Sequence, residues 1–274
     1  FLPSARFSNR WSLASLIYIS PILIYGVDLR SFMGPGNMKN NWMNAPAKKN
    51  EPYNPTNVEH IANVLTHGVW ILPSVGVTLY LSSLSNSSYE HDAALVFGIG
   101  LTLLLVVSTS FHYVSFKRQS LRLKHALHRF DRAMIYIFIA TSYFPWFSLH
   151  PELFDIHGIK TNWLVWMLVA MGILYQQAFH EKYKLLDTVL YVAVAVLPSL
   201  LLQRGKIFPG VHELLYGGLS YIAGTAFFKL DGKIPFAHAI WHSFVILGVG
   251  FHSCAMSNFL IWEKKVPDHE KLTM

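Results

Sequence analysis

Long apolar stretches recur along this chain, and they constrain its fold more than any other feature. Stretches of roughly 17 to 25 residues can cross a hydrocarbon core about 30 Å thick as helices. Lipid offers the backbone no hydrogen-bond partners, so such stretches must form helices or a closed barrel, and the lack of alternating apolar and polar residues favours helices. We therefore predict an all-α membrane protein with seven spans. The predicted spans are 65–84, 93–114, 133–147, 164–178, 188–202, 214–228 and 237–262.

The composition agrees with that class. Of the 274 residues, 53% are hydrophobic and only 14% are charged, which leaves too few polar side chains to cover a soluble domain. The single cysteine, Cys254, excludes an intrachain disulfide framework. The sequence contains no basic patch interleaved with aromatic residues, so we expect no nucleic-acid partner.

The distribution of basic residues predicts the topology of the seven-transmembrane helical bundle. The loop between the second and third spans is rich in Lys and Arg, whereas the loop over 85–92 contains neither. Because cytoplasmic loops carry the excess of Lys and Arg, we place the 115–131 loop in the cytoplasm. Strict alternation of the spans then predicts a cytoplasmic N-terminus and a C-terminus on the opposite side.

The N-terminal fifty residues differ from the rest of the chain. They contain an apolar run, WSLASLIYISPILIYGV, followed by a segment rich in Gly, Pro, Asn and Lys. The run fits a signal peptide, an extra span or sequence upstream of a native start, and a signal peptide contradicts the predicted topology. We expect residues 1–50 to be an extension or linker, disordered or partly foreign to the native protein. The transmembrane domain then covers 51–264, and 265–274 form a C-terminal tail.

Two histidines at the start of the last span form the sharpest local feature. His238 and His242 lie one helical turn apart on one face, where two imidazoles can reach a single metal ion. His238 falls in the first turn, where the helix dipole disfavours imidazolium and keeps a neutral ring. By itself, this spacing is more typical of two packed or interfacial residues than of a metal site.

Three further polar residues are expected at the same membrane face. Ser108 and His112 are four residues apart at the end of the second span, and Asp131 precedes the third. Three histidines with an open fourth position are typical of a catalytic zinc, and a nearby carboxylate can take a proton from water. The alternative for Asp131 is an ion pair with Arg132 or Arg129 that caps the helix.

Other polar residues have simpler interpretations. Glu59, Asn63 and His67 are spaced by four residues along the first span, and this stripe must face the bundle because lipid does not tolerate it. We expect it to form a helix–helix contact, and a role in orienting metal ligands is the alternative. His125, His128 and His180 fall in predicted loops, where we expect solvated side chains, with a role as an alternative metal ligand left open for each.

The patterns E-x3-N-x3-H, S-x3-H and H-x3-H, with an aspartate opening the third span, resemble the progestin and adipoQ receptor family, which includes the hemolysin III proteins. The resemblance runs from about residue 53 into the last span. The segments VVSTSFHYVSFK, HEKYK and FFKLDGKIPFAHAIWH are most similar to its monocyte to macrophage differentiation factor branch. The resemblance implies Zn²⁺ held by His112, His238 and His242, with a water bridged to Asp131.

The resemblance also implies a function. We expect an integral membrane zinc protein with a receptor-like signalling role, in which hydrolysis of a lipid amide such as ceramide is the expected chemistry. Asp131 is then the base, and Ser108 donates a hydrogen bond to the carbonyl oxygen. The alternative is a non-catalytic Golgi scaffold for Ras-pathway signalling, with a structural zinc and cytoplasmic signalling proteins as partners. In either case we expect a multi-pass protein of the Golgi or another endomembrane rather than the plasma membrane.

Overall fold

The computed structural model describes residues 42–118, 120–149, 155–156, 159–160, 162–202 and 210–265. The chain divides into two units, Phe1–Gly36 and Asn37–Met274, and all described residues belong to the second. Most of the predicted N-terminal extension and nearly all of the C-terminal tail lie outside the described residues.

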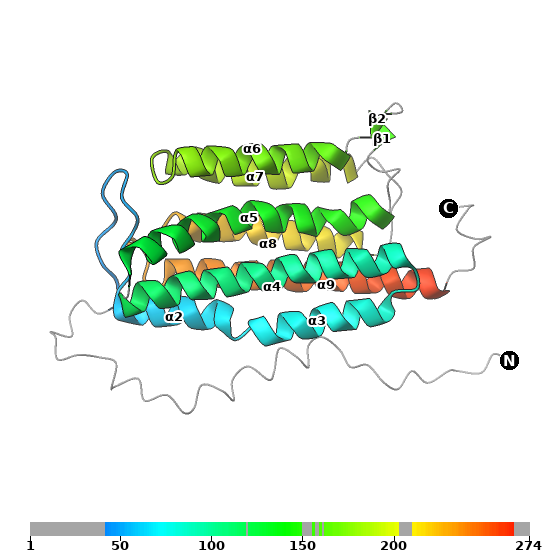
Figure 1. Cartoon of the computed structure of the whole chain (residues 1–274), viewed down its shortest axis with the longest axis horizontal. Coiled ribbons are helices and arrows are strands. Elements are labelled where there is room, and N and C mark those ends of the chain that lie inside the picture. The colour runs from blue at the N-terminus through cyan, green and yellow to red at the C-terminus, as the bar shows by residue number, and fades with distance from the viewer. Residues whose placement is uncertain are drawn as a thin grey trace. The chain divides into compact units, whose positions relative to one another are not determined.

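The described part of the chain is almost entirely helical, as predicted (Figure 1). The only strands described are β1 (Asp155–Ile156) and β2 (Ile159–Lys160), which pair antiparallel. Each predicted span coincides with all or part of a helix or helix pair. The helices are α2 (Asn57–Gly68), α3 (Ile71–Leu84), α4 (Ser88–Lys117), α5 (Leu121–Leu149), α6 (Asn162–Ala178), α7 (Lys184–Leu202), α8 (Val211–Phe228) and α9 (Ala237–Lys265).

Three helical segments of the described residues have the length and composition of membrane spans. They are Asn57–Leu84, Ser88–Lys117 and Ala237–Leu260, with mean hydropathies of 1.5, 2.2 and 1.4. The surface carries large apolar side chains such as Leu72, which is 81% exposed, and Leu174, which is 70% exposed. Such a surface suits lipid better than water. The chain is therefore a helical membrane protein.

The first predicted span is divided into two helices. α2 ends before Val69 and α3 begins after Trp70. Pro73 explains the break, because proline has no N–H to donate to the carbonyl of Val69 and its ring crowds that carbonyl. Pro145 and Pro198 lie inside the uninterrupted helices α5 and α7.

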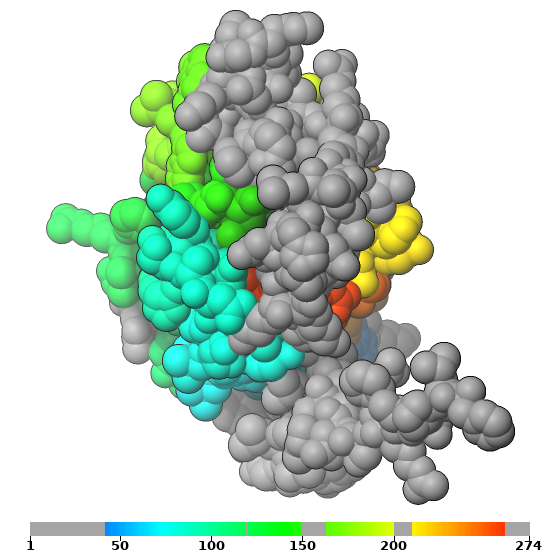
Figure 2. Space-filling model, turned by 90° about the vertical axis from the view of Figure 1, so that its right-hand side faces the viewer, coloured from blue at the N-terminus to red at the C-terminus, as the bar shows by residue number. Residues whose placement is uncertain are grey.

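α4 packs closely between α3 and α5 because glycines face both neighbours. A Cβ atom added at Gly98 would lie 2.0 Å from Oγ1 of Thr78 on α3, and one added at Gly100 would lie 2.2 Å from Oγ1 of Thr141 on α5. Small residues allow such close approach in membrane helices, where dispersion rather than water drives packing. Figure 2 shows the end of the bundle where α3 ends and α4 begins, with both helices in cyan and α8 in yellow.

Four helix ends meet at the opposite end of the bundle. The N-termini of α2, α5 and α9 and the C-terminus of α4 lie together there (Figure 1). The candidate residues predicted to share one face are carried by these helix ends. α2 contacts both α4 and α9, so side chains of these three helices can form one site.

Candidate metal centre

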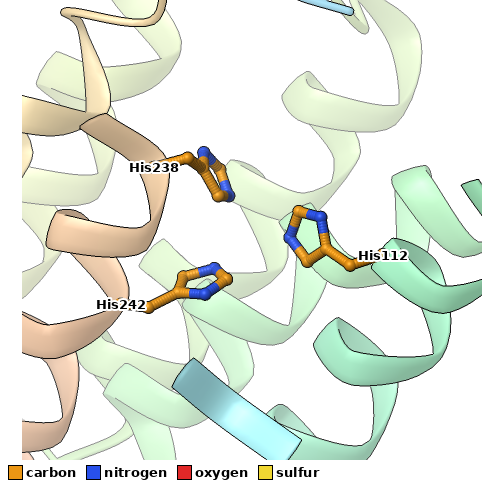
Figure 3. A group of neighbouring side chains, drawn as sticks. All are labelled: His112, His238 and His242. Atoms are coloured by element: carbon orange, nitrogen blue, oxygen red, sulfur yellow. The ribbon is translucent and has the colours of Figure 1, made fainter. Parts of the chain in front are cut away.

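Three histidines converge from two helices. His112 comes from the last turns of α4, whereas His238 and His242 come from the first turns of α9, and the three rings face one another (Figure 3). One ring nitrogen of each lies within 4.8 Å of those of the other two. His112 and His242 are buried, with 3% and 2% of their surfaces exposed. The structure thus brings the three predicted ligands together.

Two of these imidazoles are oriented by other side chains. Nδ1 of His242 lies 2.9 Å from Oγ1 of Thr66. This hydroxyl donates to the carbonyl of Ala62, so its oxygen can accept a hydrogen bond from the imidazole. Nδ1 of His238 lies 3.5 Å from the carboxylate of Asp231. Both contacts are made by Nδ1, and such support through one ring nitrogen is typical of histidines that bind a metal through the other.

The burial of His112 provides a test of whether a metal fits. Neither of its ring nitrogens has a hydrogen-bond partner among the described residues. A buried polar atom without a partner is costly, by roughly 1–3 kcal/mol, and a metal ion would satisfy one of these nitrogens. Three neutral imidazoles suit zinc and related divalent transition metals. The donor set therefore fits a zinc ion.

Ser108 and Asp131 lie beside the histidines. Asp131 lines the same cavity as His112 and His238, and its carboxylate lies close enough to the hydroxyl of Ser108 to interact with it. Oγ of Ser108 is also 2.9 Å from Nδ1 of His67. The hydroxyl can therefore direct its single proton at Asp131 while its oxygen accepts from His67. This arrangement favours a positioning role for Ser108 over the direct contact with substrate that the sequence suggested.

The arginines that could have neutralised Asp131 face other groups. Arg132 lies 2.9 Å from Glu181 and 3.5 Å from Asp187. Arg129 donates to the carbonyl of Gln177 at 2.7 Å. The alternative interpretation of Asp131, as the ion-pair partner of one of these arginines, is thus disfavoured.

The polar stripe on α2 divides between two roles. Glu59 completes a capping box with Thr56 and accepts a hydrogen bond from the hydroxyl of Tyr53 at 2.9 Å, so it stabilises the start of the helix. His67 instead contacts α4 through Ser108, which confirms the expected helix–helix contact for this residue. The contact of Thr66 with His242 was not predicted from the sequence. The residues around Thr66 gave no indication of it beyond their helical spacing.

His128 and His180 form a second group, where solvated residues were expected. His128 is only 8% exposed, and its Nδ1 lies 3.1 Å from Nε2 of His180. Burial lowers the pKa of His180 to about 4. Glu181 lies 3.6 Å from His128, and although burial opposes its ionisation, the charges of Arg132 and Lys184 hold its pKa below the usual value. The expectation of solvated histidines was wrong because the α6–α7 connection packs onto α5.

These features define a helical integral membrane protein with a buried histidine cluster at one end of its bundle. The family model described as Haemolysin-III related matches residues 56–253. The chain therefore belongs to the haemolysin-III-related family, as the motifs indicated.

Curated relatives agree with this assignment. The chain is 41% identical over 220 residues to the monocyte to macrophage differentiation factor of Homo sapiens, a match that covers 80% of this chain and 92% of that protein. The protein of the same name from Mus musculus matches equally. The hemolysin-3 homolog of Bacillus subtilis is 34% identical over 199 residues, which cover 69% of this chain and 89% of the relative.

Proposed function

We propose that this protein is a membrane-embedded, zinc-dependent hydrolase of a lipid amide of the ceramide type, with a receptor-like signalling role. The observation that carries the proposal is the convergence of three imidazoles, His112, His238 and His242, within 4.8 Å of one another, beside the carboxylate of Asp131 in one cavity. Three neutral ligands with an open position and an adjacent base are what hydrolysis of an amide requires.

In the proposed reaction, each side chain of the site has a separate role. When bound, zinc supplies a Lewis acid for the amide carbonyl and lowers the pKa of water. Asp131 accepts a proton from the attacking water at its carboxylate and can return it to the leaving amine. Ser108 holds this carboxylate in place through its hydroxyl, and His67 fixes the orientation of that hydroxyl.

The proposal includes the membrane topology. In it, α2 and α3 together form the first of seven spans, and α4 to α9 form the others. The basic residues at the end of α4, in the short connection and in the first turns of α5 favour a cytoplasmic position for this end of the bundle, which puts the N-terminus and the metal centre at the cytoplasmic face. An endomembrane such as the Golgi is the proposed location, on the basis of the family resemblance.

A structural zinc is the second candidate. The cluster joins α4 to α9, and contacts of Thr66 and His67 with His242 add α2, so an ion here would cross-link three helices. In that case the cytoplasmic loops would serve as a docking surface for signalling proteins, and turnover would be absent.

Purified protein distinguishes the two functions. We expect roughly one zinc per chain and release of fatty acid from ceramide. Asp131→Ala should keep the zinc and lose turnover by about 10²- to 10⁴-fold, the usual contribution of a general base. Asp92→Ala, which alters an exposed carboxylate near the start of α4, is the control and should change neither. Bound zinc without turnover in the unaltered protein would reject the hydrolase and favour the structural role.

A further inference from the structure

The cavity beside the histidine cluster carries a net positive charge. It has a volume of about 350 Å³ and is bounded by α5, the start of α7 and the α8–α9 connection. Hydrolysis of a neutral amide gives no reason for this charge. The cationic side chains of its wall are Lys124, Arg132, Lys184, Lys229 and Lys233.

The carboxylates of the wall are already engaged. Glu181 lies 2.9 Å from both Arg132 and Lys184. Asp231 faces the ring of His238, and Asp131 interacts with the hydroxyl of Ser108. Five basic side chains thus face three carboxylates, which leaves two positive charges in excess around the cavity, and Lys124, Lys229 and Lys233 form no ion pair within the described part of the chain. A zinc ion at the histidines would add to this excess.

Lys229 is the most constrained of the three remaining lysines. Its ammonium group donates to the backbone carbonyl of Lys184 at 2.6 Å, a neutral group. It also lies 5.6 Å from the ring centre of Phe228, whose ring faces the guanidinium of Arg132 at 4.9 Å. Two cations thus share one aromatic ring. Burial, with the nearby charge of Arg132, lowers the pKa of Lys229 to about 8, although Asp187 and Glu181 oppose the shift.

A second metal ion would suit this region less well than an anion. His128, His180 and Glu181 offer ligand atoms within 4.8 Å of one another. However, the carboxylate of Glu181 already faces two cations, and a divalent ion would add to their repulsion. An anion would instead be attracted to the lysines from several segments at once.

We infer that this cavity binds the phosphate group of an amphipathic ligand, with Lys229 as a principal partner. Resting on the proposed function, this inference makes the substrate a lipid whose polar end carries a phosphate. The phosphate would sit among the lysines while the reacting amide lies at the histidines. The apolar chains of such a lipid would extend along the exposed leucines of the spanning helices, where the bilayer receives them.

Equilibrium dialysis of the purified, zinc-loaded full chain in neutral detergent tests the site. The probes are radiolabelled inorganic phosphate, short-chain phosphatidic acid and, as the uncharged match, short-chain diacylglycerol. Lys229→Gln should weaken binding of both phosphate probes by at least about tenfold, the cost of one charge-assisted contact. Lys229→Arg should restore it. Lys182→Gln, an exposed lysine of the α6–α7 connection outside the cavity wall, should bind like the unaltered protein.

The outcomes separate the sources of the anion. Tighter binding of phosphatidic acid than of phosphate supports a lipid headgroup, and equal binding supports free phosphate in the same site. Three results would overturn the inference: unchanged binding in Lys229→Gln, equal binding of diacylglycerol and phosphatidic acid, or binding lost in His112→Ala but kept in Lys229→Gln, which would place the anion on the metal. Ceramide turnover is measured separately, so its absence alongside intact phosphate binding rejects the hydrolase and leaves the anion site standing.

Discussion

His67 stacks on His242, with ring centroids 3.6 Å apart and 15° between the ring planes. The first residue comes from α2 and the second from α9, where it is one of the three converging imidazoles. Through Nδ1, His67 also contacts the hydroxyl of Ser108, which interacts with the carboxylate of Asp131. One side chain therefore links a metal ligand to the proposed base.

This relationship predicts separable effects of two changes at His67. His67→Phe keeps an aromatic ring against His242 but removes the donor to Ser108. We expect zinc content to remain and ceramide turnover to fall by roughly 10- to 100-fold, because outer hydrogen bonds to a metal site typically contribute that much. His67→Ala should reduce both zinc content and turnover. Metal analysis and fatty-acid release measure the two effects, and equal turnover in His67→Phe and the unaltered protein would contradict the link.

Thr66 should control metal affinity through the orientation of His242. Thr66→Val replaces the hydroxyl by a methyl group of similar size, so Nδ1 of His242 loses its partner at 2.9 Å. We expect the zinc dissociation constant to rise about 10- to 100-fold, measured by competition with a chromophoric chelator. Thr109→Val is the matched control, since Oγ1 of Thr109 is buried without a hydrogen-bond partner in the described part of the chain. If both variants bound zinc equally, the role of Thr66 would be refuted.

Much of the helical arrangement could be predicted because hydrophobic length alone specifies helices in lipid. The approach of three histidines and one aspartate at one end of the bundle could be predicted too, because span alternation places their helix ends on one face. These residues are His112, His238, His242 and Asp131. The side chains that contact those residues could not be predicted. Asp231 contacts His238 from the α8–α9 connection, whose path cannot be predicted from the periodicity of apolar residues. The burial of His128 depends on how the α6–α7 connection packs onto α5. Such contacts depend on tertiary packing rather than on local pattern.

The two histidine groups should differ in metal binding. Single replacements of His112, His238 or His242 by Ala should each abolish stoichiometric zinc, because two remaining imidazoles hold the ion much more weakly. His180→Ala, in contrast, should leave about one zinc per chain. His125→Ala provides an exposed control. Metal analysis after dialysis against a mild chelator gives the stoichiometry. Zinc retained in His112→Ala and lost in His180→Ala would move the centre to the second group.

Arg132 should contribute to stability through its pairs with Glu181 and Asp187. Arg132→Gln leaves both carboxylates without their shared cation in a largely buried position, and breaking a buried pair costs roughly 3–5 kcal/mol. Equilibrium unfolding of the protein in mixed detergent micelles measures the change. Arg122→Gln alters an exposed arginine of the same helix and should change the free energy of unfolding by less than about 0.5 kcal/mol. Similar losses for both variants would argue against a specific contribution from the Arg132 pairs.

The close contact of α3 with α4 makes a final prediction. A Cβ at Gly98 would lie within 2.6 Å of three side-chain atoms of Thr78, so Gly98→Ala should force the helices apart and destabilise the protein by about 1–3 kcal/mol. Gly76, in the same helix pair, is exposed and has no atom within 4 Å of an added Cβ. Gly76→Ala should therefore be neutral or stabilising by up to about 1 kcal/mol, since alanine has the higher helix propensity. Unfolding in mixed micelles compares the two, and equal effects would mean that helix propensity rather than packing governs this contact.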